Sequence, residues 1–338
     1  MFVIGVDPHR GSHTAAVLDR DEQLVAELCI RADSAQRERL LAWAAPFEPR
    51  TWAIEGATGT GALLAQQLVA IGEAVVDVPP KLSARVRVLN DGHSDKSDAH
   101  DARSAAVVAL RHRRLRAVTV EDHIAVLRLL AKRHHELTAS RTRSVCRLHT
   151  VLTHLAAGHF PKRLSAKQGA AILRGLRPSD PVGLERKRLA HELLGEVRRA
   201  DAALADLHIR ITAEVAASGS SITDIHGVGP IVAAYVLGYT GDINRFPNAE
   251  HYARYNATAP VAVSTALKDK HRLNLLGNRM LNHAMHMIAV TQVRNDTPGR
   301  AYYRRKFDEK KSKKHAMRCL KRQISDAVYR QLIADLDR

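Results

Sequence analysis

The sequence predicts an α/β domain at the N-terminus, a helical middle region and a mostly α-helical C-terminal domain. Short apolar segments separated by turn residues predict strands within residues 1–110. Apolar residues spaced three and four apart over long stretches predict helices in the middle of the chain. Acidic residues predominate up to residue 110 and basic residues after it, which indicates parts of different function. We therefore expect domains at 1–110, 111–218 and 219–338.

The N-terminal domain is predicted to have the order βββαβα, followed by a further strand at 74–78 and more helix. Turn residues separate three closely spaced strands, and this spacing favours an antiparallel meander. Prolines end the first helix, and a glycine-rich turn at 56–61 begins the second. The expected strands are 2–8, 12–18, 23–30, 51–55 and 74–78, and the expected helices are 33–45 and 62–71.

Four acidic residues of this domain stand next to its apolar segments. Asp7 ends the first strand and Glu55 ends the fourth, and a carboxylate at the end of a buried strand is typical of a functional site. Asp98 and Asp101 precede an apolar run and share one face if that run is a helix. Two neighbouring carboxylates repel each other unless they share a cation or a proton. The alternative is a solvated helix N-terminus, where the helix dipole favours acids.

If these four carboxylates converge, they provide oxygen ligands for one or two hard cations. Mg²⁺ prefers carboxylates together with water and substrate phosphate, and Mn²⁺ accepts the same ligands. Two ions held about 4 Å apart stabilise the attacking and leaving oxygens of a phosphate displacement. The pattern therefore predicts phosphodiester chemistry.

The charge of the chain predicts a polyanionic partner. The net charge is +17 and the pI is near 10.2. Residues 1–110 hold 11 basic and 15 acidic residues, a net of −4, and the remainder holds 41 and 20, a net of +21. Aromatic residues make up only 4% of the chain, which argues against base stacking as the main contact. With neither a signal peptide nor an apolar span of about 18 residues, we expect a cytoplasmic protein without a membrane partner.

The middle region has two apolar series that are typical of coiled coils. A break at residues 177–181 separates them, which predicts an antiparallel helical hairpin that could support a dimer. The first series is Val145, Leu148, Leu152 and Leu155, and the second is Leu189, Leu193, Val197, Ala200, Leu204, Leu207 and Ile211.

The C-terminal domain combines a glycine turn, a hydroxyl pair and a basic tail. The turn Gly227-Val228-Gly229 begins an apolar helix, as in a helix-hairpin-helix segment. The N–H groups of this turn could hold a backbone phosphate. The alternative is that the turn serves only to pack two helices together. Ser264 and Thr265 precede several cationic residues, a charge setting for phosphate contact or phosphoryl transfer. The basic segment 300–322 predicts a helix that follows a nucleic-acid backbone, or else a solvated helix face.

Six motifs in register resemble the DEDD insertion-sequence transposases related to the Piv/MooV DNA invertases, over nearly the whole chain. They are Val6-Asp7-Pro8-His9, Ile54-Glu55-Gly56-Ala57-Thr58-Gly59, Lys96-Ser97-Asp98-Ala99-His100-Asp101-Ala102, Ile225-His226-Gly227-Val228-Gly229-Pro230, Ala259-Pro260 with Ser264-Thr265, and Gly277-Asn278-Arg279. The resemblance implies a RuvC-like, RNase H-type N-terminal domain, a coiled-coil insertion and a C-terminal transposase domain. It also implies a catalytic set of Asp7, Glu55, Asp98 and Asp101, which bind Mg²⁺ or Mn²⁺, with Ser264 as nucleophile.

The resemblance further implies how such a protein acts. The serine attacks a DNA phosphate to form a phosphoserine link, and the acidic domain of a neighbouring subunit completes the site. The implied partners are double-stranded DNA of the element ends and target, a structured bridge RNA that pairs with both, and further copies of the chain in a dimer or tetramer. The implied location is the bacterial cytoplasm, at the nucleoid. The chain has no obvious motif that reads DNA bases, and pairing with the RNA would supply that sequence specificity.

One segment departs from the family pattern. Relatives usually have glycines after the Ser-Ser or Ser-Thr pair, whereas here Ala266 and Leu267 follow. Glycine permits a positive φ and close backbone approach, so the loss of these glycines bears on the loop geometry and on activity, and Thr265 is the second candidate nucleophile. Two other functions fit parts of the sequence. They are a RuvC-like metal-dependent structure-specific endonuclease that uses water, and a noncatalytic nucleic-acid-binding protein.

Overall fold

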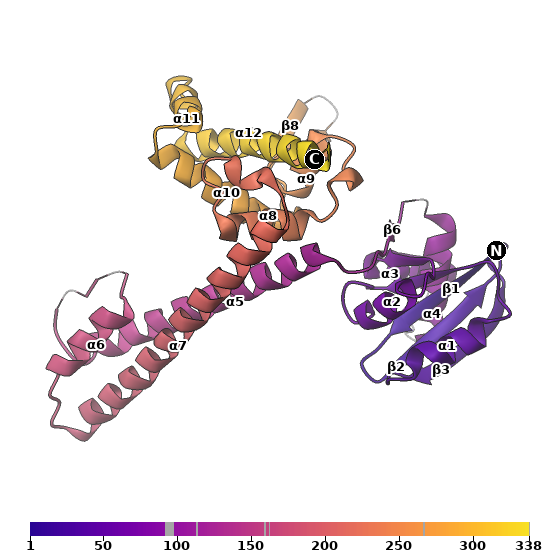
Figure 1. The fold of residues 1–338 in the computed structure, drawn as a ribbon, viewed down its shortest axis with the longest axis horizontal. Helices are drawn as coiled ribbons and strands as arrows, with labels where there is room; N and C mark the ends of the chain where they lie inside the picture. The colour runs from indigo at the N-terminus through magenta and orange to yellow at the C-terminus, as the bar shows by residue number, and fades with distance from the viewer. Residues whose placement is uncertain (92–97, 113, 159, 162, 266–267, 338) are drawn as a thin grey trace. The chain divides into compact units, whose positions relative to one another are not determined.

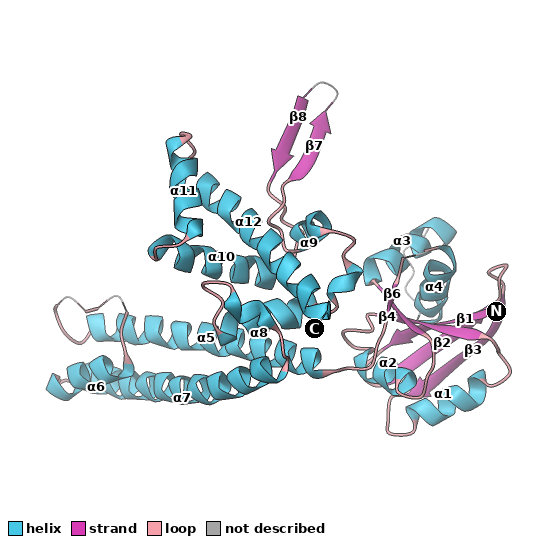
Figure 2. Ribbon diagram, turned by 45° about the horizontal axis from the view of Figure 1, so that its top comes forward, coloured by secondary structure: helices cyan, strands magenta, loops and turns pink. Residues whose placement is uncertain are grey.

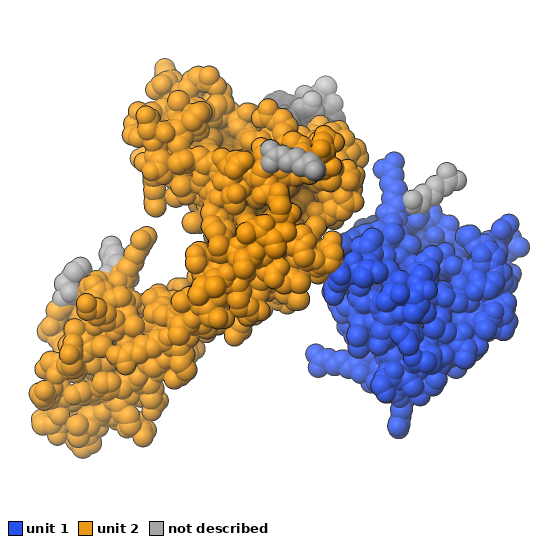
Figure 3. Space-filling model, viewed as in Figure 1, with its two compact units in different colours: residues 1–121 blue, residues 122–338 orange. Residues whose placement is uncertain are grey.

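The computed structural model describes residues 1–91, 98–112, 114–158, 160–161, 163–265 and 268–337. The chain forms two compact units, Met1–Glu121 and Asp122–Arg338 (Figure 3). Unit 1 contains the α/β domain, and unit 2 contains the long helices and the C-terminal helices. The division of the helical part into two domains stays a prediction. No helix in the described part of the chain is long and apolar enough to cross a membrane.

Unit 1 is built on a mixed six-stranded sheet with the order β3-β2-β1-β4-β5-β6 (Figure 1). The first three strands form the predicted antiparallel meander, and β4 and β5 run parallel to β1. The short β6 pairs antiparallel with β5. The strands are β1 (Phe2–Pro8), β2 (Ser12–Leu18), β3 (Leu24–Arg31), β4 (Arg50–Glu55), β5 (Val75–Val78) and β6 (Arg116–Ala117).

Helices cover both faces of this sheet because successive residues of a strand point to opposite sides. Ile4 and Val6 of β1 belong to a core with α1 and α2, whereas Val3 packs with residues of α4 and α3. The helices are α1 (Gln36–Ala44), α2 (Ala62–Val69), α3 (Pro80–Asp91) and α4 (Asp98–Arg111). Three antiparallel strands followed by two parallel ones give the predicted RNase H-like arrangement, and α3 is an addition to the predicted order.

Unit 2 begins with a long antiparallel helix pair, α5 (His123–Thr153) and α7 (Pro181–Ala217), with the short α6 (Ala166–Gly175) between them in the chain (Figure 2). Arg141 forms an ion pair with Asp201. Ser144 donates a hydrogen bond of 2.7 Å to Glu196. Residue numbers fall along one helix as they rise along the other, so the predicted helical hairpin is present. A regular coiled coil stays a prediction.

The buried seam of α7 differs from the predicted one near its N-terminal end. Leu189 is 42% exposed, whereas Ala190 and Leu194 are buried. These two residues form a core with Leu148 and with α6. A Cβ on Gly169 of α6 would lie 3.4 Å from both Leu148 and Leu194, so α6 packs closely here. A third helix therefore selects the buried face, which the spacing of leucines along α7 alone did not predict.

The C-terminal part of unit 2 is mostly helical, as predicted. The apolar α8 lies in the core, and β7 and β8 form a hairpin that extends from the helices (Figure 2). The basic segment 300–322 falls on two helices, and the second buries Leu320 and Ile324. The elements are α8 (Pro230–Thr240), α9 (Ala249–Tyr255), β7 (Val261–Thr265), β8 (Lys268–Arg272), α10 (Arg279–Arg294), α11 (Pro298–Asp308) and α12 (Lys313–Ala334), with 3-10 turns η1 (Ser221–Asp224), η2 (Ile243–Arg245) and η3 (Asp335–Asp337).

Candidate metal centre

Asp7 and Glu55 lie side by side at the carboxyl ends of two neighbouring parallel strands. Val6 of β1 is paired with Ile54 of β4, so the residues that follow them are adjacent. Asp7 is only 8% exposed, and Glu55 is half-buried. The carboxyl ends of parallel strands are where α/β sheets hold their ligands.

Helix α4 brings two further carboxylates to this edge of the sheet. A Cβ on Gly5 would lie 1.9 Å from the carbonyl oxygen of Ala102, so α4 rests directly on the backbone of β1. Asp98 and Asp101 lie in the first turn of α4, just before Ala102. Asp7 is two residues beyond Gly5 and projects from the same face of the strand. This close packing positions the first turn of α4 next to Asp7.

Three side chains come close enough to share one ion. One ligand atom each of Asp7, His9 and Asp98 lies within 4.8 Å of the other two. Nδ1 of His9 is 3.5 Å from Oδ2 of Asp7. His9 follows β1 in the turn toward β2, where its N–H donates a 2.8 Å hydrogen bond to the carbonyl of Ser12.

Glu55 is held where a negative charge is unfavourable. Burial raises the pKa of Glu55, and the charges of Asp7 and Asp101 add to the shift. The Ser83 hydroxyl and the Arg87 guanidinium oppose it. Oε2 of Glu55 is buried and has no hydrogen-bond partner among the residues that the structure describes. A positive charge at this edge would relieve the repulsion and satisfy that oxygen.

The carboxylate of Asp101 is already paired with a basic side chain of the protein. It forms an ion pair with Arg87 of α3, and both side chains are mostly buried. The four predicted residues are therefore brought to one edge of the sheet but are not equivalent. Asp7, Glu55 and Asp98 provide oxygen ligands of the kind that Mg²⁺ and Mn²⁺ prefer, and His9 adds a nitrogen ligand. The residues present fit a divalent cation.

Ser264 lies in unit 2, in the β7–β8 hairpin, paired with Asp269. The structure describes the strand at this position but not the side chain of Ser264 or that of Thr265. Ala266 and Leu267, where the sequence departs from the family pattern, lie outside the described residues, as do Lys96 and Ser97.

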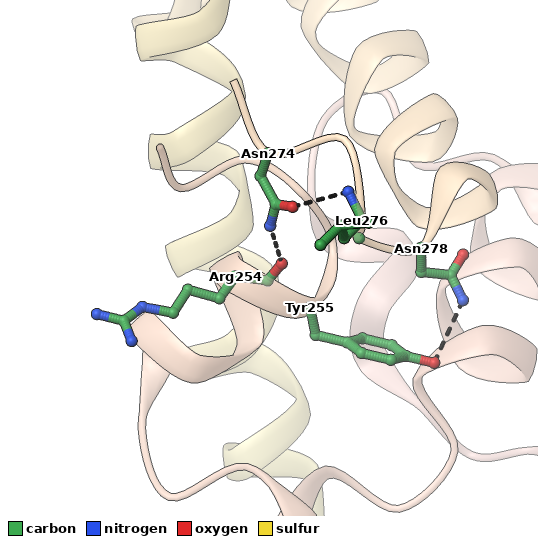
Figure 4. Close-up of a pocket in the computed structure, with 6 residues that line it drawn as sticks. Arg254, Tyr255, Asn274, Leu276 and Asn278 are labelled. Atoms are coloured by element: carbon green, nitrogen blue, oxygen red, sulfur yellow. Dashed lines mark hydrogen bonds between the residues drawn. The ribbon is translucent and has the colours of Figure 1, made fainter. Parts of the chain in front are cut away.

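Hydrogen bonds hold the loop between β8 and α10 against the end of α9 (Figure 4). The Asn274 amide donates a 2.6 Å hydrogen bond to the carbonyl of Arg254, and its oxygen accepts one of 3.0 Å from the N–H of Leu276. Asn278 caps α10 by accepting hydrogen bonds from the N–H groups of Met280 and Leu281. A cavity of about 340 Å³ lies here, lined by Arg254, Tyr255, Asn274, Leu276, Gly277 and Asn278. The Gly277-Asn278-Arg279 motif therefore lies where the loop from β8 of the hairpin joins α10.

The glycine turn before α8 packs against α10. Gly227 has a φ of +94°, and a Cβ there would lie 3.2 Å from the carbonyl oxygen of Ile288. The Gln292 side chain donates a 2.9 Å hydrogen bond to the carbonyl of His226. These contacts agree with the packing role considered for this turn, and phosphate binding by its N–H groups stays a prediction.

Two residues at the metal centre had no role in the sequence analysis. His9 stands in the first motif, two residues after Asp7, and this spacing was the signal that could have found it. Arg87 could not be found, because it lies on α3, a helix that the apolar pattern did not predict.

Comparisons with known proteins match two parts of the chain to transposase families. Residues 4–156 match a family model described as a transposase, of the DEDD type of IS110 elements. Residues 219–304 match the transposase family IS116/IS110/IS902. Among solved structures, the chain is similar to T. thermophilus RuvC in complex with a Holliday junction substrate, at a TM-score of 0.28 and 18% identity, over 35% of this chain and 99% of that one.

Two proteins of insertion elements are similar over nearly the full length. The 44.8 kDa protein of insertion element IS116 from Streptomyces clavuligerus is 26% identical over 379 residues, covering 97% of this chain and 94% of that protein. The 42 kDa protein of insertion element IS900 from Mycobacterium paratuberculosis is 26% identical over 386 residues, with the same two coverages. Both parts of the chain thus match models of one family, and the chain belongs to the IS110/IS116/IS902 family of insertion-element transposases.

Proposed function

We propose that this protein cuts and rejoins DNA at the ends of an insertion element, with a divalent cation held at the carboxyl ends of β1 and β4. The observation that carries the proposal is that Asp7 lies close to two other carboxylates. Asp98 comes near it through the Gly5 contact between β1 and α4, and Glu55 lies beside it through the pairing of β1 with β4. A bound cation lowers the charge on the phosphate and polarises its oxygens. Arg87 balances the fourth carboxylate, Asp101.

In this proposal Ser264 is the nucleophile. Its hydroxyl oxygen forms a bond to phosphorus, a bond from phosphorus to a sugar oxygen breaks, and the departing oxygen takes up a proton. The position of Ser264 in a hairpin whose second strand carries Lys268 and Arg272 supports this role, because cationic groups favour the approach of a phosphate. Thr265 is the second candidate.

The partners follow from charge and family. The +21 net charge outside residues 1–110 supports binding of double-stranded DNA at the element ends and target. Family membership supports a structured guide RNA that pairs with both DNAs, and a homo-oligomer in which one copy completes the site of another. The cation is Mg²⁺ or Mn²⁺, and the proposed location is the bacterial nucleoid.

A denaturing adduct assay tests the mechanism. The full chain is incubated with Mg²⁺ or Mn²⁺, RNA transcribed from the flanks of its element and labelled element-end DNA, and is then denatured. We expect label on the protein, and we expect Ser264→Ala and Asp98→Asn to abolish it, while Thr265→Val and the exposed-acid control Asp21→Asn retain it. Label that survives Ser264→Ala would assign the nucleophile elsewhere.

The same assay separates the other functions. Cleaved DNA without label on the protein would indicate a nuclease that uses water, as the RNase H-like unit alone would support. Binding without any cleavage, unchanged by Asp98→Asn, would indicate a noncatalytic nucleic-acid-binding protein.

A further inference from the structure

His9 is placed as a ligand beside the carboxylates of the metal centre. One of its ring nitrogens lies within 4.8 Å of a ligand oxygen of Asp7 and of Asp98. Among the residues that the structure describes, no other three histidine, cysteine, aspartate or glutamate side chains come together in this way. The His9 side chain is 52% exposed, so its ring has room to turn toward an ion at this edge.

The three ligand atoms are close to the separation that one ion requires. Two ligands on opposite sides of an ion, with bonds of about 2.2 Å, lie about 4.4 Å apart. Nδ1 of His9 is 3.5 Å from Oδ2 of Asp7. A small movement of the imidazole ring would bring the two atoms to the separation of neighbouring ligands on one ion. The hydrogen bond between the N–H of His9 and the carbonyl of Ser12 closes the turn that carries His9.

We propose that His9 is a direct ligand of the cation held by Asp7 and Asp98, and that its imidazole makes this centre selective for Mn²⁺ over Mg²⁺. The inference rests on the proposed cation site. Mg²⁺ binds oxygen ligands and keeps several waters, whereas imidazole suits transition metals. Asp101 is engaged by Arg87, and an imidazole at His9 offers a ligand atom without adding the negative charge of a further carboxylate.

Mn²⁺ binding to the metal-free full chain tests this directly. Mn²⁺ is paramagnetic, so electron paramagnetic resonance measures its affinity, and the pulsed form of the method detects a coordinated nitrogen. We expect a ¹⁴N coupling in the wild type and none in His9→Gln. His112→Gln is the matched control, because His112 follows the far end of α4, about 20 Å along the helix from Asp98. It is expected to retain the coupling.

Affinities for the two ions give a second readout. Loss of a direct ligand is expected to weaken Mn²⁺ binding about tenfold in His9→Gln and Mg²⁺ binding less than about threefold. His9→Asp restores a ligand but offers oxygen instead of nitrogen. It is expected to bind Mn²⁺ without the ¹⁴N coupling and with a smaller preference for Mn²⁺ over Mg²⁺.

The outcomes separate this inference from the site on which it rests. Mn²⁺ binding that needs Asp7 and Asp98 but has no ¹⁴N coupling, and is unchanged in His9→Gln, would overturn the role of His9 and leave the carboxylate site intact. Mn²⁺ binding unaffected by Asp7→Asn would place the ion elsewhere and overturn both. Trp43 and Trp52 both lie in unit 1, so tryptophan fluorescence verifies that each variant folds.

Discussion

Gly5 of β1 lies against the backbone of Ala102 of α4, so closely that a Cβ on Gly5 would be 1.9 Å from the Ala102 carbonyl oxygen. Side chains ordinarily separate the backbones of packed layers, by about 10 Å between two stacked sheets, and glycine removes that spacer here. The contact sets where α4 begins relative to β1. It thereby determines whether Asp98 can act together with Asp7.

Gly5→Ala is expected to displace α4 and to weaken the metal centre. A methyl group there overlaps backbone atoms that cannot move aside, and overpacking of this kind costs about 1–3 kcal/mol or more. Urea unfolding followed by tryptophan fluorescence reports on unit 1, because both tryptophans lie there. We expect a lower midpoint and weaker Mn²⁺ binding.

Gly11→Ala is the control for this substitution. A Cβ on Gly11 would meet nothing within 4 Å, so the variant is expected to match the wild type in both measurements. If Gly5→Ala also matched the wild type, β1 and α4 would not be in backbone contact in solution.

Glu55→Gln is expected to have opposite effects with and without cations. Burial and the charges of Asp7 and Asp101 raise the pKa of Glu55, so its ionised form destabilises the metal-free fold at neutral pH. Removing the charge should raise the melting temperature of the protein in EDTA. It should also shrink the increase in melting temperature that Mg²⁺ or Mn²⁺ produces. An equal increase in Glu55→Gln and wild type would show that Glu55 does not face the ion.

Glu73 is expected to stabilise unit 1 at neutral pH. Burial opposes its ionisation, but hydrogen bonds from Arg50 and Trp52 outweigh burial and lower the pKa of Glu73. Its contribution is therefore present above the unfolded value of 4.5 and is lost as the pH falls below it. Glu73→Gln should cost about 1–3 kcal/mol at pH 7. Fluorescence-detected urea unfolding at pH 7 and pH 4 measures this, and an equal loss at both values would refute the ionic contribution.

Unit 2 is expected to lose stability in mild acid. Burial lowers the pKa values of His134, His283 and His286, and neighbouring histidines or Lys321 add to the effect. These histidines favour folding when neutral, so stability is full above their unfolded value of 6.5 and falls as the pH drops below it. All seven tyrosines lie in unit 2, so near-UV circular dichroism from tyrosine follows its unfolding.

A variant pair tests this assignment. His283→Gln cannot take up a proton and should reduce the loss of stability between pH 7 and pH 5. His191→Gln, on an exposed position of α7, should leave it unchanged. A loss that is the same in both variants would assign the acid sensitivity to other groups.

The strands of unit 1 could be predicted because their apolar segments are short and are separated by clear turn residues. The predicted strand 2–8 is β1, and the predicted strand 23–30 differs from β3 by one residue at each end. Helix α3 was missed because arginines and polar residues interrupt its apolar positions. The buried position predicted at Leu189 of α7 was wrong because α6 packs against this part of α7 and buries Ala190 instead. The spacing of apolar residues along α7 carries no sign of that contact.

The acidic residues of the site could be predicted one by one, but not their relations. Nothing in the sequence says that Gly5 and Ala102 touch, and this contact sets the distance between Asp7 and Asp98. The pairing of Asp101 with Arg87 depends on the same three-dimensional packing. Position along the chain suggested the carboxylates as candidates, and only the fold shows that Asp101 is paired with Arg87 while Asp98 lies close to Asp7.

An anomalous difference map from crystals of the full chain grown with Mn²⁺ tests the central claim most directly. The account predicts a peak at the carboxyl ends of β1 and β4, within about 2.2 Å of carboxylate oxygens of Asp7 and Asp98. Ordered side chains at this edge with no peak between them, while Mn²⁺ is bound elsewhere on the chain, would contradict it.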